Sequence, residues 1–364
     1  MDIFEIQVMS NKSRKGTKPP SKKILVTQEF MMNYELFKEV VAEKFPEFMP
    51  EENKDHRVDV HSVTKVNKTM DALNLVPTGD ENYHTSPTIY INDMYEHYQK
   101  TNDLQEVLQT AASKMEHAMK EAPDVVPAID FGTAKDNIVF QLVNAEQNKE
   151  MLRDTPNRSF QDLSIIYRWI VKTDVDGIQS TVIHNSLAEK LGLSEEQMFK
   201  LAVENTRRIF PPTVKSMNDV IRDMFMKDGM PTEIADMMIG EMPTEQTMWV
   251  ISNDRGINGA ISMLYEDKIH GLAENLGTDL YLMPSSLHEV IAVSASMGDP
   301  NELAQMVAEI NMDQVALDER LSNQVYHYDK DLRRLSLATN TPNKRLDGIV
   351  AEPKLIYDSK NQFR

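Results

Sequence analysis

Hydrophobic residues in the first third of the chain follow two kinds of spacing. Residues 33–45 and 104–119 carry apolar side chains at intervals of three and four, which predicts a helix in each. Residues 58–66 and 73–76 have the shorter spacing of strands, and residues 88–91 read as a brief strand that runs into a helical stretch. We therefore expect a helix, a hairpin, a strand and then helices.

The rest of the chain is richer in predicted strands. A long apolar run at residues 163–171, a turn at 174–177 and a second run at 178–183 predict a β-hairpin. The other predicted strands are residues 138–143, 249–252, 259–264, 279–283, 289–293, 325–328 and 335–337. Helical spacing or charge predicts helices at residues 145–153, 266–276 and 303–310.

Two serines mark further helix starts. Ser186 and Ser194 each stand three residues before a glutamate or glutamine, which is the spacing of a capping box. In that motif, the serine and the later side chain bind each other's backbone N–H groups. The second of these helices should end at Pro211.

Helices lying between runs of hairpin strands indicate an α+β fold with antiparallel sheets. Strands and helices do not alternate strictly, so a doubly wound parallel sheet fits less well. We expect two subdomains, an N-terminal one at residues 31–135 and a C-terminal one at residues 136–338. An N-terminal extension at residues 1–30 and a polar tail at residues 339–364 flank them.

Composition and charge narrow the class of protein. The 364 residues include 39 basic and 57 acidic side chains, and the net charge of −18 argues against a general nucleic-acid binder. The absence of cysteine excludes disulfides, thiolate catalysis and cysteine-ligated metal sites. Neither a signal peptide nor a run of about 20 apolar residues stands out. We expect a cytoplasmic, acidic protein.

A basic segment interrupts this acidic chain near its start. Residues 10–23 contain six lysines and arginines, no acidic residue, and Gly, Ser and Pro residues that favour a flexible loop between two short strands. The loop could clamp an anionic partner. Its charge also suits a solvated arm that rests against the acidic body of the same chain.

Motifs for common chemistries are missing, including phosphate-binding glycine loops and the nucleophile elbow of hydrolases. We predict no cofactor and no metal ion. The one suggestive constellation is the turn at residues 284–289, where Ser285, Ser286, His288 and Glu289 could supply a nucleophile, a base and an orienting carboxylate. His184 or Tyr326 could join it. Neighbouring residues of a strand point to opposite faces, which favours a structural turn instead.

Methionines crowd one stretch around Pro231. Unbranched thioethers adapt to varied shapes, so they either fill an irregular core or form an exposed surface that binds other proteins. We favour the core interpretation, but an exposed patch here would be the best interaction site in the chain. The methionines nominated for that site are Met224, Met226, Met230, Met237, Met238 and Met242.

Several stretches together resemble an uncharacterised domain-of-unknown-function family of anaerobic gut bacteria. The resemblance spans residues 31–338, and the basic arm departs from the family pattern. The matching stretches are residues 32–35, 86–93, 144–152, 160–168, 202–206, 210–212, 257–260, 279–290 and 325–329. The resemblance implies an intracellular bacterial protein. It implies no activity and no site residue, because none is assigned to that family.

These observations lead to two hypotheses about function. The first is a non-enzymatic cytoplasmic protein that binds or regulates another protein, with mimicry of nucleic acid by surface carboxylates as a variant. The alternative is a hydrolase-like or metal-dependent enzyme whose site surrounds residues 284–289. Oligomeric state and ligand do not follow from the residues.

Overall fold

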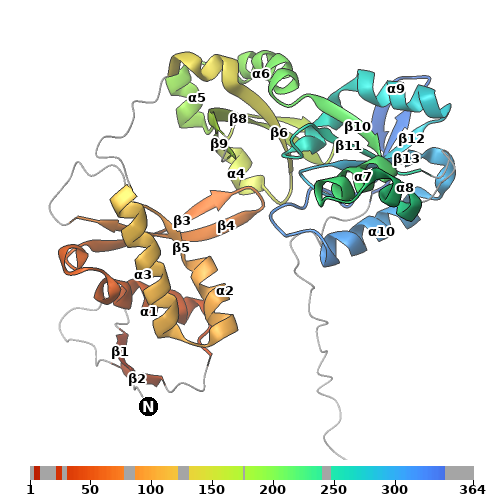
Figure 1. Ribbon diagram of the computed structural model, residues 1–364. Coiled ribbons are helices and arrows are strands. Elements are labelled where there is room, and N and C mark those ends of the chain that lie inside the picture. The colour runs from red at the N-terminus through yellow and green to blue at the C-terminus, as the bar shows by residue number, and fades with distance from the viewer. Residues whose placement is uncertain are drawn as a thin grey trace, which may run out of the picture. The chain divides into compact units, whose positions relative to one another are not determined.

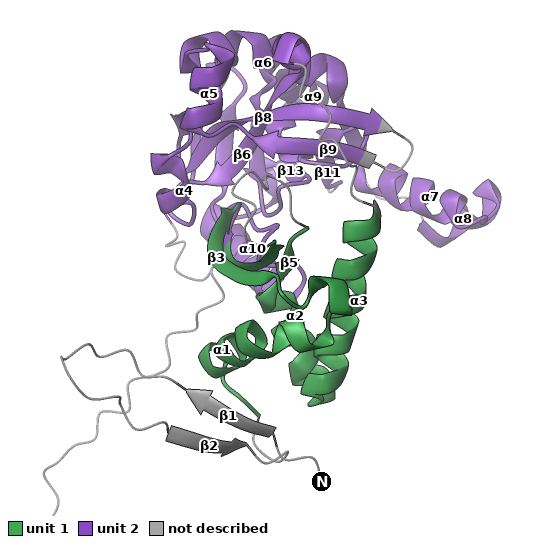
Figure 2. Ribbon diagram, turned by 90° about the vertical axis from the view of Figure 1, so that its left-hand side faces the viewer, with its two compact units in different colours: residues 1–65, 69–129 green, residues 66–68, 130–364 purple. Residues whose placement is uncertain are grey.

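The structure is a computed structural model that describes residues 4–8, 22–26, 31–77, 87–121, 131–174, 177–239 and 247–340. The chain divides into two compact units (Figure 2). Unit 1 comprises residues 1–65 and 69–129, and unit 2 comprises residues 66–68 and 130–364. The main division thus falls at residues 129/130, whereas the sequence placed it at 135/136. The 10–23 loop lies largely outside the described residues.

Unit 1 packs three helices on an antiparallel sheet (Figure 1). The sheet has the order β3 (Arg57–Lys65), β4 (Lys68–Val76), β5 (Ile89–Tyr90), and the helices are α1 (Tyr34–Lys44), α2 (Ile91–Thr101) and α3 (Leu104–Glu121). The stripes seen in the sequence form one core, in which Phe37, Leu73 and Met115 are fully buried. Near the N-terminus, β1 (Phe4–Val8) pairs with β2 (Lys22–Val26) as an antiparallel hairpin.

Unit 2 contains two antiparallel sheets. In the first, the long strand β8 (Leu163–Asp174) pairs with β6 (Ile138–Asn144), β7 (Asn157–Phe160) and β9 (Gly177–Val182). The second sheet has six strands in the order β10-β11-β13-β12-β14-β15. Their bounds are β10 Pro212–Ser216, β11 Trp249–Asn253, β12 Leu280–Met283, β13 Val290–Ser294, β14 Tyr326–Asp329 and β15 Arg334–Leu337. The fold class is therefore α+β, as predicted.

Seven α-helices are described in unit 2 (Figure 1). They are α4 (Lys149–Arg153), α5 (Asn185–Leu191), α6 (Glu195–Ile209), α7 (Met217–Lys227), α8 (Thr232–Ile239), α9 (Glu266–Leu276) and α10 (Pro300–Asp313). Helix α6 packs against β6, where the Phe140 N–H donates a 2.9 Å hydrogen bond to the Thr206 hydroxyl. Among the described residues, no helix has both the length and the apolar character needed to cross a membrane.

Three local predictions were wrong or only partly right. Residues 259–264 form a 3₁₀ helix, Gly259–Leu264, instead of a strand, because a short and fully buried apolar run has no periodicity that distinguishes the two. Helix α5 begins at Asn185 with His184 as its N-cap, so Ser186 does not cap it, whereas Ser194 forms the predicted capping box of α6. The predicted helix at 145–153 is helical only over Lys149–Arg153.

Candidate functional site

The turn at residues 284–289 connects β12 to β13 and is held mainly by backbone hydrogen bonds to residues 319–322. Ser286 forms an isolated antiparallel bridge with Arg320, and the Leu321 N–H donates to the Ser285 carbonyl oxygen at 2.9 Å. The Ser286 hydroxyl accepts the backbone N–H of His288 at 2.9 Å. Ser286 therefore does what serines commonly do in turns, which is to satisfy a backbone donor nearby.

The imidazole of His288 has partners at both ring nitrogens, and neither partner is a serine. Its Nδ1 accepts the Asn258 backbone N–H at 3.3 Å, and its Nε2 lies 3.4 Å from a carboxylate oxygen of Glu319. A base that activates a nucleophile needs a ring nitrogen within hydrogen-bond reach of that nucleophile. The hydroxyl and imidazole of this turn are not joined in that way.

Tyr326 and His184 bind other groups. The Tyr326 hydroxyl is buried and donates to the Asp162 carboxylate, which also accepts the Ser322 hydroxyl at 2.6 Å. Burial and the nearby Asp162 charge raise the pKa of Tyr326 well above its ordinary value. His184 lies with Nδ1 3.3 Å from the Thr155 hydroxyl. Two stretches of the family resemblance, residues 160–168 and 325–329, thus meet in the contact between Asp162 and Tyr326.

Glu289 lines a small cavity of about 300 Å³ beside α7. Two cationic side chains without an ion pair to the described residues, Lys227 and Arg255, share this cavity with it. The carboxylate therefore belongs to a different surface from the His288 ring. Across the described residues, no group of three histidine or acidic side chains is placed to hold a metal ion.

Helices α7 and α8 form a helical hairpin that projects from the six-stranded sheet (Figure 2). No residue of α7 is buried, and Ala235 is the one buried residue of α8. The exposed fractions of Met237, Met238 and Met224 are 82%, 63% and 59%, and Met226 is also exposed. Our preference for a methionine-filled core was therefore wrong for these four. Met230 is half-buried, and Met242 lies outside the described residues.

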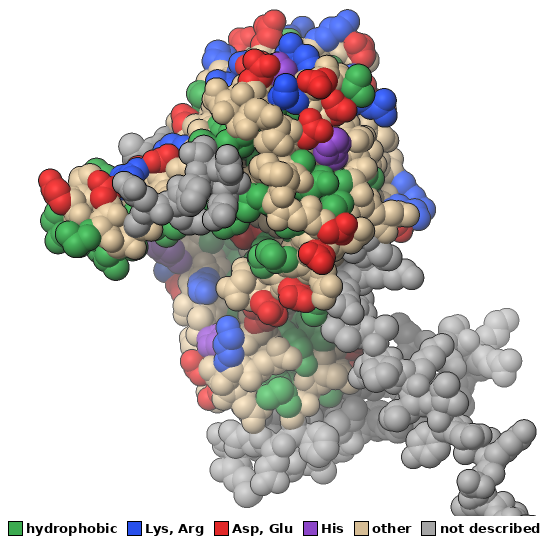
Figure 3. Space-filling view, turned by 90° about the vertical axis from the view of Figure 1, so that its right-hand side faces the viewer, with side chains coloured by type: hydrophobic (Ala, Val, Ile, Leu, Met, Phe, Trp, Pro, Cys, Tyr) green, Lys and Arg blue, Asp and Glu red, His purple; other side chains and the backbone are tan. Residues whose placement is uncertain are grey.

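The exposed apolar residues of α8 lie on one face. Ile234, Met237 and Met238 occupy positions i, i+3 and i+4, which neighbour one another on a helix surface. Figure 3 shows hydrophobic side chains gathered on this projecting part of unit 2, at the left of the view. We refer to these three residues as the α8 face. Exposure of long apolar side chains in a group, rather than singly, is typical of interaction surfaces.

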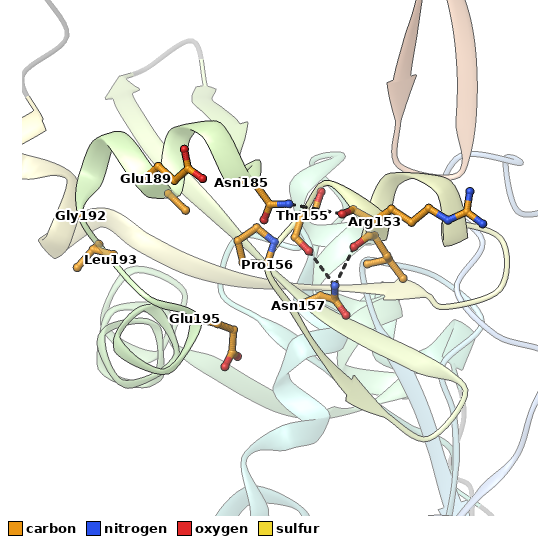
Figure 4. A pocket seen from close by; sticks show the side chains of 11 residues that line it. Arg153, Thr155, Pro156, Asn157, Asn185, Glu189, Gly192, Leu193 and Glu195 are labelled. Atoms are coloured by element: carbon orange, nitrogen blue, oxygen red, sulfur yellow. Dashed lines mark hydrogen bonds between the residues drawn. The ribbon is translucent and has the colours of Figure 1, made fainter.

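A larger pocket, of about 690 Å³, lies where α4, β7, α5 and the start of α6 come together (Figure 4). Its polar lining includes the side chains of Asn157, Asn185, Glu189 and Glu195. Its apolar lining consists of Leu152, Pro156, Ala188 and Leu193. None of the residues of the 284–289 turn lines it. We call it the α5 pocket.

A compact polar cluster supports one wall of the α5 pocket. Arg158 donates two hydrogen bonds to Glu195, at 3.0 and 2.9 Å, and the Tyr167 hydroxyl donates to the same carboxylate. Burial opposes ionisation of Glu195, but the hydrogen bonds from Arg158 and Tyr167 outweigh it and hold the pKa of this carboxyl below its usual value. Glu195 is therefore ionised and neutralised by Arg158.

Comparison with known families decides what the chain is related to. The sequence model of the protein family DUF5688, whose function is unknown, matches residues 34–330. The chain belongs to this family. The match covers both units of the fold and agrees with the resemblance seen in the sequence. No curated protein and no solved structure matches the chain.

The residues of the α5 pocket were missed by the sequence analysis. Asn157 and Asn185 were not nominated as functional residues, and Glu189 was interpreted only as part of a capping box. Asn157 lies on β7, whereas Asn185 and Glu189 lie four residues apart on α5, so no spacing along the chain links the strand residue to the helix. The one usable signal was Gly192, which stands just after a helical stretch and ends α5 in the left-handed conformation (φ 64°).

Proposed function

We propose that this member of DUF5688 is a cytoplasmic interaction or regulatory protein that binds a partner protein through the α8 face. The observation that carries the proposal is the exposure of Ile234, Met237 and Met238 on one side of a helix that is itself at the edge of unit 2. Leaving apolar side chains in water costs free energy that a partner's surface would recover.

The size of the α8 face indicates the shape of the partner. Ile234, Met237 and Met238 are 48%, 82% and 63% exposed, so together they form an apolar patch on the order of a few hundred Å², a size that is often functional. Two such faces laid flat on each other would bury less than the roughly 1,200 Å² of a stable interface. A partner with a hydrophobic groove would surround the helix and bury more, and i, i+3, i+4 anchors are the pattern that such grooves accept.

The charges beside the α8 face indicate which residues should border the partner's groove. Asp228 ends α7 and Glu233 lies in the first turn of α8, and both are exposed without an ion pair to the described residues. These carboxylates flank the tip of the hairpin. A groove bordered by lysine or arginine would pair with them and would associate faster at low ionic strength.

Site-specific photocrosslinking tests the proposal. A photoreactive amino acid is placed at position 237 of the full chain, in the cells that naturally make it, and at position 332 as a matched control. Leu332 is 72% exposed on the turn between β14 and β15, away from the hairpin. We expect a discrete adduct from position 237, abolished by Met238→Glu, and none from position 332.

Two outcomes would count against this function. The same adducts from both positions would indicate unspecific contact. The absence of an adduct from position 237 would rule out the α8 face as an interaction surface. An adduct made of two copies of this chain would keep the surface but replace the grooved partner by a second copy.

The enzyme hypothesis has less support. It needs Ser285 or Ser286 to contact His288, and both nitrogens of that ring are occupied by Asn258 and Glu319 instead. Assay of the purified chain against ester and phosphoester model substrates, with His288→Ala as the control, would test it directly.

A further inference from the structure

The α5 pocket offers hydrogen-bond acceptors. Both amide hydrogens of Asn157 are used, because its Nδ2 donates to the carbonyl oxygens of Leu152 and Thr155 at 3.0 and 2.8 Å. This fixes the orientation of the carboxamide and leaves its Oδ1 without a partner among the described residues. The Nδ2 of Asn185 similarly donates to the Arg153 carbonyl oxygen, at 3.4 Å, and its Oδ1 also lacks a partner.

The charge that the pocket presents is negative. Glu195 is neutralised by Arg158, but Glu189 lines the pocket and forms no ion pair within the described residues. Arg153 is the one cationic residue of the lining. Its guanidinium points away from the other labelled side chains and pairs with Glu150 (Figure 4). One carboxylate and two amide oxygens therefore remain for a ligand.

The remaining wall is apolar and suits a hydrocarbon chain. Leu152, Pro156, Ala188 and Leu193 contribute it, and Ala188 is buried. Lysine, arginine and polyamines combine a flexible methylene stem with a cationic head that has only donors. Such a ligand would lay its stem on the apolar wall and donate hydrogen bonds to these acceptor groups.

We propose that the α5 pocket binds an alkylammonium or alkylguanidinium group, carried either by a free polyamine or by a lysine or arginine side chain of a peptide. This site is separate from the α8 face and does not depend on the function proposed above. The net charge of −18 attracts any cation, so the site must be distinguished from that general attraction.

Calorimetric titration of the full chain at about 150 mM salt, where long-range attraction is largely screened, provides the test. The probes are spermidine, the peptide acetyl-Gly-Arg-Gly-amide, and the same peptide with citrulline, which is neutral but similar in shape. We expect saturable 1:1 binding of spermidine, of the arginine peptide, or of both, and binding of the citrulline peptide at least about 10-fold weaker than that of the arginine peptide. The better cationic probe identifies the source of the ligand.

Matched variants distinguish binding in the α5 pocket from general attraction to the acidic protein. Glu189→Gln should weaken binding about 10-fold, whereas Glu204→Gln, which removes the same charge from an exposed position of α6, should change it less than twofold. Asn185→Asp adds a carboxylate to the pocket and should tighten binding several-fold. Equal effects of Glu189→Gln and Glu204→Gln, or no saturable binding of either cationic probe, would overturn the proposal.

Discussion

Arg158 on β7 holds Glu195 at the start of α6 by two parallel hydrogen bonds, of 3.0 and 2.9 Å. The same guanidinium lies over the ring of Phe199, 3.7 Å from its centroid. This pair therefore joins a strand to a helix and fixes one wall of the α5 pocket. A planar guanidinium suits both contacts, which a lysine would not reproduce.

Replacement of Arg158 should weaken the fold measurably. In Arg158→Ala the half-buried Glu195 keeps only Tyr167 as a charge-stabilising partner, and we expect a loss of about 1–2 kcal/mol in the free energy of unfolding. Arg153→Ala breaks an ion pair that is about 70% exposed on both sides, so a loss below about 0.5 kcal/mol is expected. Urea denaturation of the two variants measures both losses in the free energy of unfolding. Equal losses would contradict the larger contribution that we assign to Arg158.

The stability of unit 2 should fall in acid through Glu266. Hydrogen bonds from Arg333 and Tyr328 lower the pKa of Glu266 to about 2, from an ordinary value of 4.5. The ionised form is favoured in the folded state, so this contribution is fully present above about pH 4.5 and is lost as the pH falls towards 2. Because both Glu266 and Arg333 are roughly half exposed, solvent screening keeps the effect small.

Comparison with Glu266→Gln isolates this contribution. The wild-type chain should be more stable than the variant at pH 7, and the difference should shrink between pH 4.5 and 2. Urea midpoints at pH 7, 4 and 2.5 check this. A difference that stays constant across these pH values would show that the carboxylate charge does not contribute.

Two glycines should respond to alanine in opposite directions. A Cβ at Gly259 would lie 2.1 Å from the Ser252 hydroxyl oxygen and 2.4 Å from the His288 carbonyl oxygen, so Gly259→Ala should cost about 1–3 kcal/mol or more. Gly271 lies within α9 with nothing near the added atom, and Gly271→Ala should stabilise by up to about 1 kcal/mol. Thermal unfolding followed by circular dichroism measures both; stabilisation by Gly259→Ala would contradict the predicted clash.

Two tyrosines of β14 offer a test of burial. Tyr326→Phe removes the buried hydroxyl that donates to Asp162, and we expect a loss of about 1.5–3 kcal/mol. Tyr328→Phe removes a 2.6 Å hydrogen bond to Glu266, whose carboxylate is 43% exposed and can bind water instead. That loss should be about 1 kcal/mol or less. A larger loss for Tyr328→Phe would reverse our ranking of the two contacts.

Local patterns predicted most elements well because their causes are local. The apolar stripe of α3 and the serine and glutamine that cap α6 act within a few residues of each other. Helix α9 was predicted with its observed bounds. The segment Gly259–Leu264 was misassigned because a short, largely buried apolar run has no spacing that distinguishes a 3₁₀ helix from a strand.

Residues 284–289 and the methionines show where local reasoning ends. Ser286 and His288, two positions apart, could be placed in one turn, but the partners of the His288 ring, Asn258 and Glu319, come from about thirty residues away on either side. The methionines of α7 and α8 were compatible with either a core or a surface, since an apolar helix face does not specify its neighbour.

The sequence by itself determined the α+β class, most helix and strand positions, and membership of a family, because periodicity, capping and motif order are properties of the chain. Only the tertiary structure decided that the α8 face is exposed, that His288 is bound away from the serines, and that Asn157, Asn185 and Glu189 share one pocket. Those facts depend on which faces pack together, and that choice is made by the free energy of the whole fold rather than by any one segment.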